Sequence, residues 1–192
     1  MAKIQKNNKG FSLIELIVTL AVVSILVSIA APSFMDVLRD NRTATDANKL
    51  IATIQLARSE AAKQGVPVTI SNDGDDTGNT ANQWEKGWIV FTDWNGNGVY
   101  DDNSSASECE LEKDCLLRTQ SALANDLTLT TSGAFSESLT YNPSGFPVDL
   151  VTDSFSLCSK NGDTTNARTI TISNTGRPSI EQGALSCTVA AI

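Results

Sequence analysis

Histidine is absent from this sequence of 192 residues. Its absence excludes Ser-His and Cys-His nucleophile pairs, His-ligated metal sites and His general bases. Positive charge is scarce, because 14 Lys and Arg stand against 22 Asp and Glu, and the formal net charge is -8. Tight nucleic-acid binding depends on many basic contacts to phosphates, so this charge argues against it. Neither a Walker A sequence nor a GxGxxG stretch occurs, and we expect neither enzymatic activity nor a cofactor.

One long apolar run stands out, from Phe11 to Ala31, with Glu15 as its single charged residue. A helix of this length spans about 30 Å, which matches the hydrocarbon core of a bilayer. Residues 1–10 carry three lysines and no acid, so the N-terminus is expected in the cytoplasm and the rest of the chain across the membrane. Three interpretations remain open: a plain anchor, a secretory signal cleaved after Ala30, and a retained helix in which Glu15 has a function.

Glu15 is the residue that the first two interpretations leave unexplained. A carboxylate inside a membrane helix costs about 2.5–3.5 kcal/mol near the bilayer centre and less toward its edge, so it usually has a partner. The segment from Gly10 to Glu15 reads GFSLIE, follows a short Lys-bearing leader and opens the apolar helix. This arrangement resembles the class III signal of type IV pilins and type II secretion pseudopilins.

The resemblance implies a processing route and a way of assembling. A membrane prepilin peptidase would cleave between Gly10 and Phe11 and methylate the new amino group of Phe11. The helix would stay on the mature protein, and Glu15 would face the amine of Phe11 in a neighbouring subunit, so that two charges costly in lipid offset each other. The implied partners are other major and minor pilins or pseudopilins, the prepilin peptidase/methyltransferase and an inner-membrane assembly platform.

We expect four segments: a cleaved leader at 1–10, a transmembrane half-helix at 11–34, an amphipathic half-helix at 35–65 and a β-rich head at 66–192, periplasmic or extracellular. Pro32 should kink the helix, because it lacks an N–H and clashes with the preceding turn. Gly65 and Pro67 should end the helix. The amphipathic half has apolar positions spaced by three and four residues, which predict one buried stripe: Ala47, Leu50, Ile51, Ile54, Ala57 and Ala61.

After Gly65 the sequence changes to short β-rich runs between turn residues, which predicts an α+β fold with a β-sheet head packed on the long helix. The expected strands are Val66–Ser71, Gly87–Thr92, Leu116–Gln120, Leu127–Thr131, Leu139–Asn142, Ser154–Cys158, Arg168–Ser173 and Arg177–Glu181. Three strings make the head similar to the GspH/FimT type of pilin-like proteins: LARSEAAKQGVPVTI, GWIVFTDWNGNG and ITISNTGRPSI.

Four cysteines occur, an even number in a chain expected to face an oxidising compartment, and they predict disulfides. We expect Cys109–Cys115 to close a short loop and Cys158–Cys187 to tie the last segment to a strand. Two other pairings are possible. A zinc site made of all four thiolates is a further alternative, but no CxxC pair supports it.

The segment from Asp93 to Asp101 has two interpretations. Oxygens of Asp93, Asn95, Asn97 and Asp101 stand where a calcium loop places its ligands, although Ser104 replaces the final bidentate Glu. Asn-Gly after a strand is also typical of a hairpin turn. The acid-rich stretch 73–114 is read either as a solvated loop region or as a docking face for a basic partner or divalent cations.

Tryptophans and one arginine complete the candidate residues. Trp88 is expected to pack against the long helix, whereas Trp84 or Trp94, if exposed, could serve a subunit interface. Some FimT-type proteins bind DNA through a basic C-terminal tail, which draws attention to Arg177. No Lys or Arg follows Arg177, and Arg168 is the only other nearby base, so no nucleic-acid partner is expected.

The function that the resemblance implies is that of a minor pilin: cleaved, N-methylated, stored in the bacterial inner membrane, and assembled into or at the tip of a type IV pilus. The main alternative is a minor pseudopilin of a type II secretion system. A DNA-binding pilin for DNA uptake is a less favoured alternative.

Overall fold

The computed structural model describes residues 11–72, 82–101, 112–131, 133–160, 162, 164–183 and 187, with the backbone alone at 31–33. The chain divides into two compact units, Met1–Arg39 and Asp40–Ile192, which are described separately. The first unit holds the apolar part of the long helix. The second holds the rest of that helix together with the β-strands.

Helix α1 runs from Leu13 to Gln64. At its start, the backbone N–H of Glu15 donates to Ser12 Oγ at 3.3 Å, which is an N-cap bond. At its end, Gly65 adopts a φ of +71° and its N–H donates to the carbonyl of Ala61 at 3.0 Å. A left-handed glycine closes a helix at little cost, so the expected stop at Gly65 is confirmed. The helix continues through Pro32, and the kink expected there stays a prediction.

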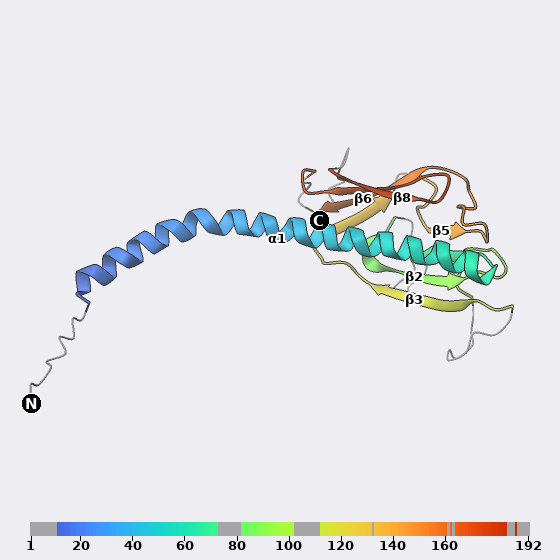
Figure 1. The fold of residues 1–192 in the computed structure, drawn as a ribbon, viewed down its shortest axis with the longest axis horizontal. Helices are drawn as coiled ribbons and strands as arrows, with labels where there is room; N and C mark the ends of the chain where they lie inside the picture. Colours follow the sequence, from blue (N-terminus) through green and yellow to red (C-terminus); the bar gives the residue numbers. More distant parts are fainter. Residues whose placement is uncertain are drawn as a thin grey trace, which may run out of the picture. The chain divides into compact units, whose positions relative to one another are not determined.

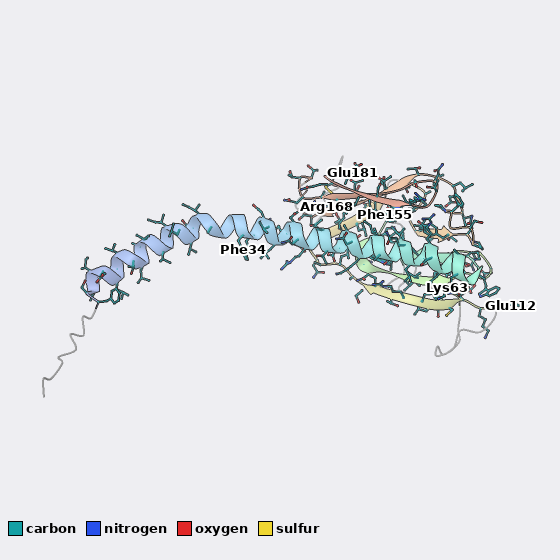
Figure 2. The ribbon with its side chains drawn as sticks, in the orientation of Figure 1. Phe34, Lys63, Glu112, Phe155, Arg168 and Glu181 are labelled. Atoms are coloured by element: carbon teal, nitrogen blue, oxygen red, sulfur yellow. A yellow bond between two sulfur atoms is a disulfide. The ribbon has the colours of Figure 1, made fainter. Side chains whose placement is uncertain are left out.

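The first unit presents apolar side chains outward around the helix. Every residue from Phe11 to Ala30 is exposed, and Figure 2 shows side chains projecting from this part of the helix and, further along it, Phe34. Helix α1 contains a stretch long and apolar enough to cross a membrane, and none of that stretch is buried. The exposed apolar residues continue past the bilayer-sized run, because Met35, Val37 and Leu38 are also at least 36% exposed.

In the described part of the second unit, eight strands form two antiparallel sheets (Figure 1). The first sheet has the order β3-β2-β1-β5 and the second β4-β6-β7-β8. The strands are β1 Val68–Ser71, β2 Gly87–Thr92, β3 Cys115–Ser121, β4 Leu127–Thr131, β5 Ser138–Tyr141, β6 Asp153–Ser159, β7 Arg168–Ile172 and β8 Pro178–Gln182. Each matches a strand expected from the sequence, with ends displaced by at most two residues, and the α+β fold is confirmed. A short 3-10 turn, η1 at Trp84–Lys86, precedes β2.

The head part of α1 shares one hydrophobic core with both sheets. Figure 1 shows this part of the helix running between β2 and β3 on one side and β6 and β8 on the other. The expected stripe is confirmed, because its members are buried, with Ile51 partly so: Ala47, Leu50, Ile51, Ile54, Ala57 and Ala61. The sheets contribute alternate residues to the same core, for example Phe155 and Leu157 of β6 and Ile170 of β7.

Polar contacts also join α1 to the rest of the head. Arg168 of β7 is 9% exposed, and its guanidinium forms an ion pair with Asp40 of α1 at 2.5 Å. Arg58 donates from Nε to the carbonyl of Gly145 at 2.9 Å. Burial of a guanidinium is tolerated when its N–H groups are paired, so both contacts fix the helix against the head.

Candidate assembly site

The candidate assembly site is the first turn of α1, with Phe11, Ser12 and Glu15. Phe11 is 83% exposed, and Gly10, the other residue of the predicted cleavage site, lies outside the described residues. Ser12 is the N-cap, and Glu15 stands three residues later, the spacing of a capping box. The Ser-x-x-Glu pattern could have revealed this cap in the sequence. The positive end of the helix dipole also favours a carboxylate here.

Glu15 differs from the other polar side chains of the apolar segment. Three hydroxyls bond to carbonyl oxygens one turn back in their own helix: Thr19 to Leu16, Ser24 to Ala21 and Ser28 to Ile25, at 2.7–2.8 Å. Such back-bonding lets a hydroxyl enter an apolar environment. Among the described residues, the Glu15 carboxylate meets no hydrogen-bond donor or cation. Unlike the three hydroxyls, the Glu15 carboxylate therefore needs a hydrogen-bond donor or a cation from elsewhere.

A cation for Glu15 has few possible sources. The sequence contains no Lys or Arg between Phe11 and Leu38, so Arg39 is the nearest basic residue on the C-terminal side. A helix rises about 1.5 Å per residue, which puts Arg39 far beyond the reach of Glu15 within one chain. A positive charge must come from the N-terminal side of this helix or from another chain. That requirement agrees with an N-terminal amine as the partner.

The turn that follows β2 is organised around Asp93, which is fully buried. Its Oδ2 accepts hydrogen bonds from the Thr69 hydroxyl at 2.8 Å and the Gly98 N–H at 2.9 Å, and its Oδ1 accepts from the Asn97 N–H at 3.1 Å. These donors come from the protein itself. The carboxylate therefore acts as the acceptor that shapes the turn, as the hairpin interpretation expects.

The calcium interpretation gains no support from this geometry. Asn95 and Asn97 both donate amide N–H bonds to Asp101 Oδ2, at 2.9 and 3.0 Å. Within the described residues, no group of three or more Cys, Asp or Glu could hold a metal ion. Ser104 and most of the acid-rich stretch lie outside the described residues. Calcium binding by Asp93, Asn95, Asn97 and Asp101 stays an untested prediction.

Asp114 joins this turn, although nothing in the sequence singled it out. It is 3% exposed, and its two oxygens accept the N–H groups of Trp94 at 3.0 Å and Asp101 at 3.3 Å. Burial raises the pKa of Asp114 above its ordinary value. Hydrogen bonds from Asn95 and Asn97 lower the pKa of Asp101. Two neighbouring carboxyl groups are thus shifted in opposite directions by different causes.

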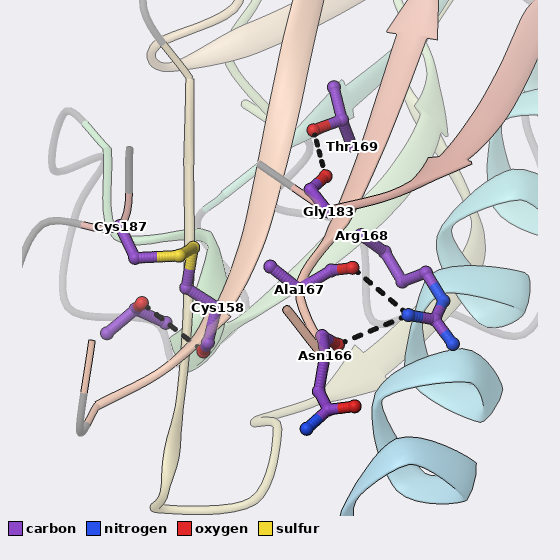
Figure 3. Close-up of a disulfide and its surroundings, with 8 residues drawn as sticks. Cys158, Asn166, Ala167, Arg168, Thr169, Gly183 and Cys187 are labelled. Carbon is purple, nitrogen blue, oxygen red and sulfur yellow. Dashed lines mark hydrogen bonds between the residues drawn. A yellow bond between two sulfur atoms is a disulfide. The ribbon is translucent and has the colours of Figure 1, made fainter. Parts of the chain in front are cut away.

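One disulfide joins Cys158 of β6 to Cys187, as predicted (Figure 3). It ties a residue near the end of the chain to the second sheet. Near it, Arg168 donates to the carbonyl oxygens of Asn166 and Ala167. Cys109 lies outside the described residues, so its pairing with Cys115 stays a prediction.

The three tryptophans have different environments. Trp88 is fully buried in the shared core, which confirms its expected packing on the helix. Trp84 is also fully buried: its indole N–H donates to the Phe135 carbonyl at 3.0 Å, and its ring meets Phe155 edge-on. The expectation that Trp84 could be exposed at a subunit interface is therefore wrong, because η1 turns this ring into the core. Trp94 remains 40% exposed.

Arg177 is exposed just before β8, in the turn that its N–H and carbonyl form with Ser173. The other base considered with it, Arg168, is held by Asp40 and by two carbonyl oxygens. Arg168 is therefore engaged within the protein and does not offer a second phosphate ligand beside Arg177. Whether the chain binds nucleic acid stays a prediction.

An apolar, capped N-terminal helix with an acid that has no partner among the described residues, leading into a helix-backed head of two antiparallel sheets, defines a pilin-like subunit. The family described as "Type II transport protein GspH" matches residues 46–176, and the "Prokaryotic N-terminal methylation motif" matches residues 5–31. The chain belongs to the GspH family, whose members are structural subunits. It is a minor pilin or pseudopilin with an N-terminal methylation motif.

Two crystal forms of one type IV minor pilin agree with this assignment. The type IV minor pilin FimU of Pseudomonas aeruginosa is 29% identical in one crystal form, with a TM-score of 0.57, covering 77% of this chain and 96% of that chain. A second crystal form gives 28% identity, a TM-score of 0.54, and coverage of 76% and 99%. The minor pseudopilin EpsH of Vibrio cholerae is 13% identical, with a TM-score of 0.46 and coverage of 73% and 97%. No curated protein matches the sequence.

Proposed function

We propose that this protein is a minor pilin that enters, or sits at the tip of, a type IV pilus and supports its biogenesis. The observation that carries this proposal is the similarity to FimU, a type IV minor pilin, which extends over 96% of the FimU chain. The methylation motif at residues 5–31 supports the processing route. Prepilin peptidase cleaves between Gly10 and Phe11 and methylates the Phe11 amine.

Assembly is the mechanism, and Glu15 carries it. Before assembly the apolar part of α1 spans the inner membrane, with the N-terminus in the cytoplasm and the head in the periplasm. On assembly the helix leaves lipid for a bundle of similar helices, and Glu15 pairs with the Phe11 amine of a neighbour. The absence of a donor or cation for Glu15 among the described residues supports this pairing. Such head-to-tail contacts do not close on themselves, so they generate a filament.

The partners are other major and minor pilins, the prepilin peptidase/methyltransferase and the inner-membrane assembly platform. No catalytic role, cofactor or nucleic acid is included in the proposal. A gel shift with the detergent-solubilised protein at near-physiological salt tests the last point. A specific DNA complex would restore the DNA-uptake function considered for Arg177.

A minor pseudopilin of a type II secretion system is the second candidate. The family's description as a type II transport protein favours it. A deletion strain, complemented with the wild-type gene, separates the two when assayed for twitching motility and for release of secreted proteins. The proposal expects loss of twitching with normal secretion. Loss of secretion with normal twitching would overturn the minor-pilin proposal in favour of a minor pseudopilin.

Processing is tested directly by mass analysis of the N-terminus of protein purified from membranes. The proposal expects methylated Phe11. An N-terminus at Ala31 would indicate a secretory signal, and an intact Met1 would indicate a plain anchor. Either result would remove the assembly mechanism.

A further inference from the structure

Two Asn-Gly pairs stand in tandem in the turn after β2, at residues 95–98, and assembly through α1 does not use them. The two asparagines are held in the same way. The Oδ1 of Asn95 accepts the N–H of Asn97 at 3.0 Å, and the Oδ1 of Asn97 accepts the N–H of Val99 at 2.8 Å. Both Nδ2 groups donate to Asp101 Oδ2. The side chains therefore offer two matched amides.

The glycine nitrogens that follow them are not matched. The Gly98 N–H donates at 2.9 Å to Oδ2 of Asp93, a fully buried carboxylate. The Gly96 N–H has no acceptor among the described residues. The space beside Gly96 is also open, since a Cβ placed there would meet no atom within 4 Å. Asn95 itself is exposed to water.

We propose that Asn95 is a site of self-modification, at which its side-chain amide converts to a carboxylate through a cyclic imide with Gly96. In mildly alkaline water, hydroxide removes the Gly96 amide proton, and the nitrogen attacks Cγ of Asn95. The new N–Cγ bond forms as the Cγ–Nδ2 bond breaks, and the nitrogen leaves as ammonia after taking a proton from water. Water then opens the imide at either carbonyl, which gives aspartate or isoaspartate.

The turn supports the first step in two ways. Negative charge develops on Oδ1 of Asn95 during the attack, and the Asn97 N–H already points at that oxygen. A donor placed where charge develops lowers the barrier to its formation. Glycine after the asparagine leaves the attacking nitrogen without a neighbouring side chain that blocks its approach.

Asn97 is the internal control that the chain itself provides. Its Oδ1 has a backbone donor, the Val99 N–H, and Asn95 Oδ1 has the Asn97 N–H, which it shares with Asp93 Oδ1. The developing charge therefore has a donor at both sites, and the weaker donor stands at Asn95. The attacking nitrogen at Asn97, however, would have to give up the hydrogen bond to Asp93. A hydrogen bond to a buried charged acceptor is among the stronger ones in proteins. Conversion is therefore expected at Asn95 in preference to Asn97.

The modification changes the electrostatics of the turn. Asp101 now accepts an amide N–H from Asn95, which helps to lower its pKa. After conversion that donor is replaced by a second carboxylate. Like charges at this distance disfavour ionisation, so the pKa of Asp101 rises. The turn loses a hydrogen bond and gains one negative charge.

The test is incubation of the full-length protein in detergent at mildly alkaline pH, followed by peptide mapping with mass spectrometry. Aspartate and isoaspartate at positions 95 and 97 are quantified over time, and an isoaspartyl methyltransferase provides an independent label. Several-fold faster conversion at Asn95 than at Asn97 is expected in the folded protein. Equal rates, faster conversion at Asn97 or no conversion at Asn95 would overturn the proposal.

Two comparisons show whether the fold creates the difference. In concentrated urea both hydrogen-bond patterns are lost, so the ratio of the two conversion rates should approach one. A preserved ratio would mean that the local sequence causes the difference, and it would overturn the structural argument.

The variant Asp93→Asn weakens the bond that holds the Gly98 N–H and should raise conversion at Asn97 relative to Asn95. An unchanged ratio in folded Asp93→Asn would also count against the structural argument.

Discussion

The indole N–H of Trp88 donates a hydrogen bond to the hydroxyl oxygen of Thr53 across 3.2 Å, and both residues are fully buried. This bond joins β2 to the buried face of α1. The Thr53 hydroxyl in turn donates to the carbonyl of Lys49 at 2.9 Å. The position of the helix along the sheet is therefore set by a polar contact inside an apolar core, and slippage would leave the indole without an acceptor.

Thr53→Val tests this contact. Valine keeps the shape of threonine but removes the acceptor, so a buried N–H is left unsatisfied at a cost of about 1–3 kcal/mol. The change is read from urea unfolding of the detergent-solubilised protein. Thr45→Val is the matched control, because exposed Thr45 makes the same bond to a carbonyl one turn back and should change stability by at most about 0.5 kcal/mol. Equal effects of the two variants would contradict the proposed register contact.

The Cys158–Cys187 disulfide should contribute substantially to the stability of the head. It joins residues separated by 29 positions. Closing a loop of that length restricts the unfolded chain and is worth about 2–4 kcal/mol. The double variant Cys158→Ala with Cys187→Ala should lower the urea midpoint accordingly. Reductant should lower the midpoint of the wild type by more than that of the variant; similar losses in both would assign the stabilisation elsewhere.

Local patterns in the sequence predicted most of this fold. Helix stop residues placed the end of α1, and three-four spacing identified its buried stripe because a helix repeats every 3.6 residues. Short runs such as Gly87–Thr92 and Leu127–Thr131 matched strands to the residue. Each of these features depends on residues that are close together in the chain, so a single sequence is enough to predict it.

Contacts between distant segments were not predictable in the same way. Trp84 lies in the core because η1 and β6 meet there, and Trp88 meets Thr53 across 35 positions. Asp114 joins the Asp93 turn across a stretch that the structure does not describe. Which carboxylate becomes buried depends on how distant segments pack, and the spacing of residues along the chain does not predict that packing. The Ser12 cap, by contrast, was readable from its Ser-x-x-Glu pattern.

Asp101 and Asp114 should titrate in the opposite order from two ordinary aspartates. Burial raises the pKa of Asp114, and hydrogen bonds from Asn95 and Asn97 lower that of Asp101. Carboxyl carbon NMR of the detergent-solubilised protein should show Asp101 ionising below the ordinary aspartate range and Asp114 above it. Asn97→Ala removes one donor and should raise the pKa of Asp101. Titration of both groups together in the ordinary range would refute this assignment.

The consequence of the Asp114 shift for stability has a definite sign. Folded Asp114 keeps its proton at pH values where the unfolded chain has released it, so its contribution to stability falls as pH rises from the ordinary aspartate range through the folded pKa. Asp114→Asn should flatten stability across that window. Asp101 acts oppositely, because its contribution is present above the ordinary range and is lost as pH falls through its lowered pKa. Urea unfolding at pH values above the ordinary aspartate range checks the sign for Asp114, and unfolding at more strongly acidic pH, below that range, checks the sign for Asp101.

Glu15→Ala should leave cleavage and methylation at Phe11 intact and abolish incorporation into the filament. The carboxylate lacks a partner among the described residues, so its removal harms the subunit little in the membrane but removes the charge that meets a neighbour's amine. The measurement compares the variant in sheared pili with its level in membranes. Ser12→Ala is the matched control: it removes the hydroxyl that accepts the Glu15 N–H, costing about 1 kcal/mol locally, but keeps the carboxylate. Normal incorporation of Glu15→Ala, or equal losses in both variants, would show that Glu15 serves the helix start rather than assembly.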